Sequence, residues 1–102
     1  MLTRDKKNTV TSKEAIIKGI AEDGGLFVPE YFPRLGPVDQ LIDYDYKKLA
    51  ATILSLYFTD YSKDQLQSAV NGAYDDKFRG QSPIGIKTIG NAHFLELFYG
   101  PT

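Results

Sequence analysis

The amino-acid sequence predicts an α+β fold, a small domain in which a helical hairpin packs on a short β-hairpin. Two segments in the middle of the chain, 45–57 and 62–74, carry apolar residues at helical spacing. After Pro83 the apolar period falls to two, and two such runs are separated by Gly90-Asn91. The chain has 102 residues, a length that suits one domain, so we expect residues 1–102 to form a single unit.

The composition excludes several classes of protein. It is 42% hydrophobic and 25% charged, which is typical of a soluble globular chain and not of a disordered one. The net charge is −1, with basic residues spread among acidic ones, so we expect no nucleic-acid partner. The absence of cysteine excludes a disulfide, a zinc–thiolate site and a cysteine nucleophile. We expect a cytoplasmic protein without a membrane partner, because no apolar run approaches roughly 18 residues and no secretory signal is visible.

The first predicted helix begins at a capping box. The Thr11 hydroxyl is placed to accept the Glu14 amide proton, and the Glu14 carboxylate to reach back to the Thr11 amide. We expect Asp23-Gly24-Gly25 to end the helix, because glycine enters left-handed backbone without a Cβ penalty. The apolar stripe of this helix consists of Ile16, Ile17, Ile20 and Ala21.

Two further helices follow a segment rich in proline. Residues 26–28 are expected to form a short, buried, extended run, and 29–37 a loop or a single helical turn. The second helix starts at Asp45, and the third starts at a second capping box, formed by Ser62 and Gln65. Their apolar stripes are Tyr46, Leu49, Ala50, Ile53, Leu56 and Tyr57 in one, and Leu66, Ala69, Val70, Ala73 and Tyr74 in the other.

The two runs with a period of two predict a β-hairpin. A two-residue Gly90-Asn91 loop suits a primed turn. In that register Ile89 faces Ala92 and Lys87 faces Phe94. Glu96 is then diagonal to Lys87, and we expect the two side chains to pair.

No self-contained active centre is visible in the sequence. His93, the single histidine, is interpreted as a structural or surface residue, because no nucleophile and acid are spaced to converge on it. Asp43 and Asp45 are interpreted as helix-capping residues, and Asp75 and Asp76 as a solvated helix end, so we expect no metal site.

A phosphate-binding loop is not expected either. Gly24-Gly25 lacks the spaced glycines and the Lys-Ser/Thr pair of a P-loop, so it is interpreted as a helix C-cap.

Two motifs nevertheless carry a resemblance to a known family. "TSKEAIIKGIAEDGGLFVP", Thr11 to Pro29, resembles the amino-terminal signature of threonine synthase. "LELFYGPT", Leu95 to Thr102, resembles the Leu-Glu-Leu-Phe-His-Gly-Pro-Thr of that family, with Tyr99 where the family usually has His. Thr3-Arg4-Asp5 resembles its Ser-Thr-Arg-Gly, with Asp5 in place of Gly. The matching positions of the first motif are Glu14, Ala15, Gly19, Ala21, Asp23, Gly24, Gly25, Leu26, Phe27, Val28 and Pro29.

The resemblance implies part of a pyridoxal-phosphate enzyme of the tryptophan-synthase-β-like fold. Such enzymes convert O-phosphohomoserine and water to threonine and phosphate, and their cofactor lysine lies a few residues beyond the Gly-Pro-Thr. The resemblance therefore implies that this chain is an amino-terminal fragment of such an enzyme. We expect it to be inactive alone, with no catalytic or cofactor-binding residue within 1–102. Its partners would be the remaining catalytic domains of the same chain and, in the full enzyme, O-phosphohomoserine. The residues implied to lie near the active site are Tyr99, Gly100, Pro101 and Thr102.

Two alternatives stay open at this point. One is a threonine synthase-like phospho-lyase that eliminates phosphate without making threonine, and the other is a stand-alone interaction module. In the fragment interpretation, apolar patches left by missing domains are expected to make the chain self-associate.

Overall fold

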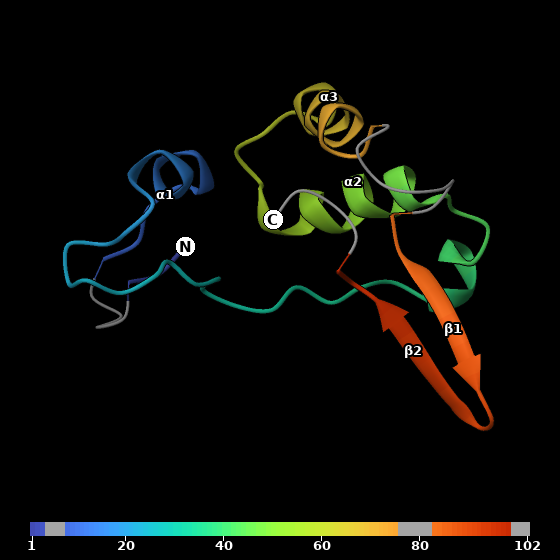
Figure 1. The fold of residues 1–102 in the computed structure, drawn as a ribbon. Coiled ribbons are helices and arrows are strands. Elements are labelled where there is room, and N and C mark those ends of the chain that lie inside the picture. Colours follow the sequence, from blue (N-terminus) through green and yellow to red (C-terminus); the bar gives the residue numbers. More distant parts are fainter. Residues whose placement is uncertain (4–7, 76–82, 99–102) are drawn as a thin grey trace.

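A computed structural model describes residues 1–3, 8–75 and 83–98 of the chain. Within these residues, three α-helices are followed by one antiparallel pair of strands (Figure 1), which confirms the predicted α+β class. The elements are α1 (Ser12–Lys18), a 3-10 turn η1 (Val38–Leu41), α2 (Tyr46–Tyr57), α3 (Lys63–Ala73), β1 (Gly85–Ile89) and β2 (Ala92–Glu96).

The N-terminal part of the chain is held together by isolated backbone bridges around α1. Leu2 pairs with Thr9 and with Val28, and Ile20 pairs with Leu26. The Leu2–Val28 bridge has two hydrogen bonds, 2.7 Å from the Leu2 N–H and 3.0 Å from the Val28 N–H. The extended run over 26–28 is therefore confirmed. It is not buried, because Leu26 and Val28 are both exposed.

The first helix has the predicted start and a different end. Thr11 and Glu14 form the complete capping box, with the Thr11 N–H donating to the Glu14 carboxylate at 2.9 Å. The helix ends at Lys18, where Gly19 adopts a φ of 70° and donates its N–H to the Ala15 carbonyl. The prediction that Gly24-Gly25 caps the helix was wrong, because the first glycine along the chain already supplies the left-handed residue.

The two longer helices form the predicted hairpin. Asp45 caps α2 by accepting the Lys48 N–H at 2.8 Å, and Ser62 and Gln65 form the capping box of α3. Asp43 lies in the turn before α2 and does not cap it. Tyr46 at the start of α2 meets Tyr74 after the end of α3, with ring centroids 4.8 Å apart, so the two helices run antiparallel. Val70, 1% exposed, is the most buried side chain between them.

The β-hairpin has the predicted register. Ile89 pairs with Ala92 and Lys87 with Phe94, across the Gly90-Asn91 loop in which Gly90 has a φ of 60°. The predicted pairing of Lys87 with Glu96 is not formed: among the described residues the ion pair present is Lys18–Glu22. The Glu96 carboxylate instead lies over Gly85, directly opposite it, 2.7 Å from where a Cβ would stand.

The helices do not cover this hairpin. All strand positions except Gly85 and Glu96 are exposed, and in Figure 1 the hairpin projects away from α2 and α3. The radius of gyration is 16.3 Å, whereas a compact domain of about 100 residues has roughly 13 Å. The expected packing of the helical pair on the sheet is therefore absent from the described part of the chain, and both elements keep open apolar surface.

Candidate functional site

The described residues do not assemble a catalytic centre. Across 1–3, 8–75 and 83–98, no group of three or more His, Asp or Glu side chains is placed to hold a metal ion. His93 lies on the exposed hairpin, with its Nδ1 atom 2.9 Å from the Thr88 hydroxyl on the neighbouring strand. The interpretation of His93 as a structural or surface residue is confirmed, because its side chain is exposed. The group that it contacts is a threonine on the neighbouring strand and not a nucleophile or an acid.

The four residues predicted to lie near the active site, Tyr99, Gly100, Pro101 and Thr102, fall outside the described residues. Asp76 falls outside them as well. Their roles therefore stay predictions.

The Asp23-Gly24-Gly25 motif forms a tight loop with a structural role. The Asp23 carboxylate accepts the Gly25 N–H at 2.9 Å, and the Gly25 carbonyl accepts the Ala21 N–H at 2.9 Å. Gly24 has a φ of 75°, a left-handed conformation that favours glycine. The motif thus reverses the chain so that Ile20 and Leu26 pair.

Glu14 is equally structural. Hydrogen bonds from the Thr11 backbone N–H and from the Thr11 hydroxyl hold the pKa of the Glu14 carboxyl below its ordinary value. The group is exposed and committed to the cap, so it has no geometry for proton transfer.

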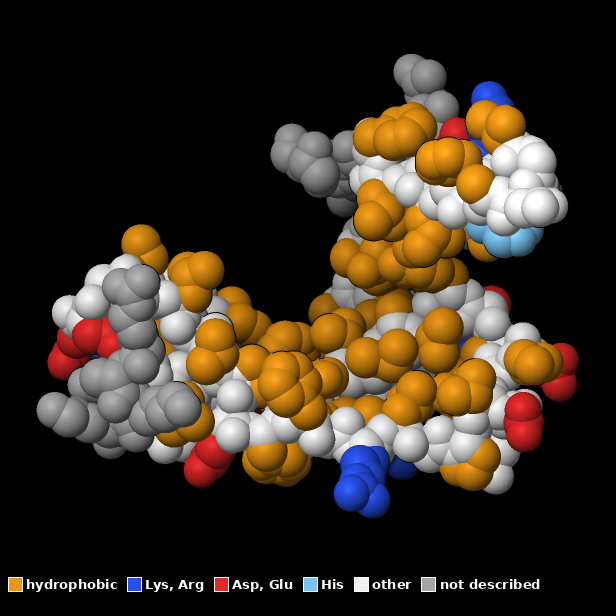
Figure 2. Space-filling model, turned by 90° about the horizontal axis from the view of Figure 1, so that it is seen from below, with side chains coloured by type: hydrophobic (Ala, Val, Ile, Leu, Met, Phe, Trp, Pro, Cys, Tyr) orange, Lys and Arg blue, Asp and Glu red, His pale blue; other side chains and the backbone are white. Residues whose placement is uncertain are grey.

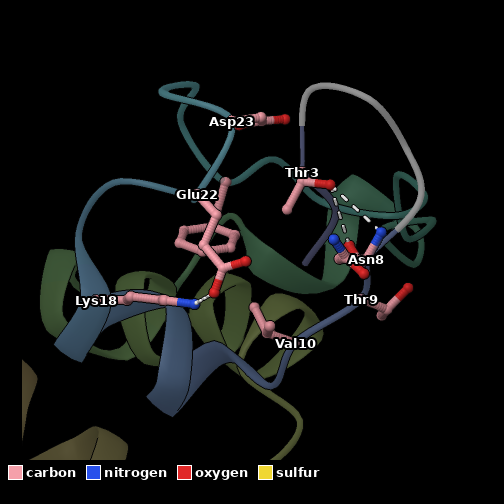
Figure 3. Close-up of a pocket in the computed structure, with 8 residues that line it drawn as sticks. Thr3, Asn8, Thr9, Val10, Lys18, Glu22 and Asp23 are labelled. Atoms are coloured by element: carbon pink, nitrogen blue, oxygen red, sulfur yellow. Dashed lines mark hydrogen bonds and ion pairs between the residues drawn. The ribbon is translucent and has the colours of Figure 1, made fainter.

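A polar cavity of about 480 Å³ lies between this loop and the N-terminus (Figure 3). Its charged groups already have partners, because the Lys18 ammonium is 2.9 Å from the Glu22 carboxylate and Asp23 holds the loop. Thr3 and Asn8 bond to each other on the opposite side. The cavity therefore has no free cation for a phosphate group within the described residues. The lining residues are Thr3, Asn8, Thr9, Val10, Lys18, Glu22, Asp23 and Phe27.

Asp60 links α1 to the loop between α2 and α3. Its carboxylate accepts the Ser12 hydroxyl, and its other oxygen accepts the Lys13 N–H at 2.9 Å. Lys13 also stands over the Tyr61 ring, 4.9 Å from its centroid. The hydrogen bond from the Ser12 hydroxyl is the main reason why the pKa of the Asp60 carboxyl lies below its ordinary value. No local pattern predicts this contact, because it joins residues 48 positions apart.

Many large apolar side chains lie exposed on the surface of the described residues. Figure 2 shows hydrophobic side chains spread across one broad face of the molecule. A monomeric soluble protein seldom leaves large contiguous apolar areas open, so such a surface marks a contact site. The sequence predicted an apolar stripe on the first helix and a buried run over 26–28, but periodicity shows which side of an element is apolar and not what covers it. Over the described residues as a whole, and not on one face alone, the exposed apolar side chains include Ile16, Ile17, Ile20 and Leu26 around α1, Tyr31, Phe32 and Val38 in the proline-rich segment, and Ile86, Ile89, Phe94 and Leu95 on the hairpin.

Fold and surface together define a small α+β domain that exposes broad apolar areas and shows no catalytic centre in its described residues. The family model described as threonine synthase N terminus matches residues 1–74. The chain belongs to this threonine synthase family, in its amino-terminal region.

Curated relatives support the same assignment over more of the chain. The threonine synthase of Schizosaccharomyces pombe is 35% identical over an alignment of 105 positions. The alignment covers 98% of this chain and 20% of the relative. That of Saccharomyces cerevisiae is 34% identical over 92% of this chain and 20% of the relative. Threonine synthase-like 1 of Mus musculus is 38% identical over 87% of this chain and 13% of the relative. The chain thus spans about a fifth or less of these proteins.

In the described residues no helix is long and apolar enough to cross a bilayer.

Proposed function

We propose that the chain is the amino-terminal domain of a pyridoxal-phosphate enzyme that converts O-phosphohomoserine and water to threonine and phosphate. The observation that carries this proposal is the match to threonine synthases over 98% of the chain but only 20% of the relative. The exposed apolar surface supports it, since such a surface suits contact with the remaining domains of a longer polypeptide.

In this proposal the described residues do not hold the cofactor. Pyridoxal phosphate needs a lysine for its covalent link and a group of donors for its phosphate. Lys18, on the rim of the polar cavity, is paired with Glu22, and Lys13 and Lys48 lie over the rings of Tyr61 and Tyr44. Cofactor binding and chemistry therefore belong, in this proposal, to the domains that the relatives carry beyond the matched region.

The contribution of this domain is to deliver the chain to the active site. The β-hairpin ends at Glu96, and Gly100-Pro101-Thr102 follows shortly after it. Glycine permits unusual backbone angles and proline fixes φ, so this turn is suited to aim the segment that follows it. Tyr99 stands at the position of the usual histidine, so the role of that histidine is not carried over to this chain.

The test uses the full polypeptide that the gene encodes. Purified with pyridoxal phosphate, it is expected to acquire a visible absorbance band and to release phosphate and threonine from O-phosphohomoserine. The 102-residue chain is expected to do neither. A full polypeptide that binds no cofactor contradicts the proposal. In cells, we expect a fluorescent fusion of that polypeptide to distribute through the cytoplasm.

A second candidate function is a phospho-lyase that eliminates phosphate from a related substrate. It is favoured by the 38% identity to a protein named threonine synthase-like 1, which is as high as the identity to the threonine synthases themselves. Product analysis separates the two: phosphate release without threonine identifies the lyase. A stand-alone interaction module is favoured only if the reading frame ends at Thr102.

A further inference from the structure

The β1–β2 hairpin has the surface of an unfinished sheet. Isolated two-stranded hairpins are marginally stable in water, and three or more strands or a covering helix are usually needed. Here both faces are apolar and open: Ile86 and Leu95 share one face, Ile89 and Phe94 the other, and Ile86 is 67% exposed. Strands that are apolar on both sides are typical of sheets covered on both faces.

The two outer edges of the hairpin are not equivalent. In an antiparallel pair, alternate residues exchange hydrogen bonds with the partner strand, and the residues between them direct their N–H and C=O groups outward. With Ile89 and Ala92 flanking a two-residue loop, the outward residues are Ile86 and Thr88 on β1, and His93 and Leu95 on β2. The Leu95 carbonyl is already taken by the Leu97 N–H at 3.1 Å. The β1 edge is therefore the more open one for pairing with another strand.

Charge disfavours the register in which two copies of β1 overlap along their full length. An antiparallel β1–β1 pair that matches Ile86 with Thr88 of the other copy brings the two Lys87 side chains face to face at its centre. Like charges directly opposite each other are unfavourable, and lysine on an edge strand is a common device against such self-pairing. Lys87 instead favours a strand that carries a carboxylate opposite it.

We propose that the outer edge of β1 accepts a strand from the part of the polypeptide that lies outside residues 1–102, with an acidic side chain opposite Lys87, so that the hairpin becomes the edge of a larger sheet. This inference rests on the proposed function, because the Schizosaccharomyces pombe relative is about five times as long as the segment it shares with this chain. The added strand takes the outward backbone groups of Ile86 and Thr88 and extends the two apolar faces of the hairpin into a wider sheet.

Amide hydrogen exchange tests the proposal in the full polypeptide and in the 102-residue chain. The Ile86 and Thr88 amides are expected to exchange rapidly in the shorter chain and at least about 100-fold more slowly in the full polypeptide. The Lys87 and Ile89 amides point toward β2 and serve as internal controls for hairpin formation in both. Equal, rapid exchange of Ile86 and Thr88 in a full polypeptide that binds the cofactor overturns the strand addition while leaving the proposed function intact.

Substitutions give an independent test in the full polypeptide. Thr88→Pro removes an outward N–H and is expected to abolish the slow exchange of Ile86. Lys87→Glu is expected to speed exchange at Ile86 and Thr88 about tenfold, because it opposes the partner carboxylate. The control Lys63→Glu, at an exposed position at the start of α3, is expected to leave the exchange unchanged. Protection of Ile86 that grows with concentration in the 102-residue chain would show a second copy on this edge and overturn the assignment to the rest of the polypeptide.

Discussion

At the scale of single residues, the helix caps are the features that the sequence specifies most directly. Thr11, Asp45 and Ser62 each accept a backbone N–H three residues along the chain, as their spacing predicts. A cap depends on residues within one turn of each other, so no knowledge of the rest of the fold is needed to find it.

Ser62→Ala is expected to destabilise the α2–α3 pair by about 1 kcal/mol, because the first turn of α3 loses the acceptor for the Gln65 N–H. Urea denaturation followed by far-UV circular dichroism measures the change. Ser68→Ala, at an exposed position inside α3, is the matched control and should leave the midpoint unchanged or raised. Equal midpoints for Ser62→Ala and the native protein would show that the cap does not stabilise α3.

Asp60 represents the opposite case, a contact that no local pattern predicts. Because its pKa is depressed in the folded chain, the ionised carboxylate stabilises the fold above its unfolded pKa. That contribution is lost as the pH falls below about 3.8, when the folded group takes up its proton.

Asp60→Asn is therefore expected to reproduce at neutral pH the loosening that acid causes in the native protein. The readout is the exchange rate of the Lys13 amide, which donates to this carboxylate at 2.9 Å and should lose protection. Asp39→Asn in the exposed η1 turn is the control. A Lys13 amide that stays equally protected in the Asp60 variant contradicts the assigned role.

At the scale of elements, sequence periodicity found the helices and the hairpin but not every boundary. The hairpin register followed from a two-residue loop that fixes which residues face each other. The end of α1 did not follow, because Gly19 and Gly24 both offer a left-handed turn and only the backbone pairing of Ile20 with Leu26 selects the first.

The apolar stripe of α3 is partly buried, whereas that of α1 is largely exposed. Leu66 and Val70 of α3 are buried as expected, but Ile17 of α1 is 87% exposed. Apolar periodicity identifies a face that must be covered, and in this chain the cover for α1 and for the hairpin is absent from the described residues. For the same reason the sequence identified the family but could not place Tyr99–Thr102 in a site.

Leu66→Ala tests where the core lies. Removing this buried side chain is expected to cost about 2–5 kcal/mol and to unfold the α2–α3 pair, because the vacated space cannot be filled by the exposed side chains elsewhere. Ile17→Ala deletes an apolar side chain of similar size at an exposed position, and its effect should stay within about 0.5 kcal/mol. Thermal denaturation of both variants measures the contrast. Similar losses of stability in the two variants would show that Ile17 on α1 belongs to the core as much as Leu66 does.

At the scale of the whole molecule, the helices and the β-hairpin form an extended arrangement in which few large side chains are fully buried. A radius of gyration of 16.3 Å, against roughly 13 Å for a compact chain of this length, leaves apolar side chains on α1, the proline-rich segment and the hairpin in contact with water. The same surface that suits docking within a longer polypeptide is expected to make the 102-residue chain associate with itself.

We therefore expect the 102-residue chain to self-associate through apolar contacts, with an apparent size that rises with concentration in size-exclusion chromatography. Because burial of apolar surface drives the process, sulfate should strengthen it, whereas association through charges would weaken as salt is added. Ile17→Lys places a charge on the apolar surface and is expected to shift the equilibrium toward monomer. Gln40→Lys adds the same charge at an exposed polar position and should not. A chain that stays monomeric in sulfate at all concentrations would show that this apolar surface is not adhesive on its own.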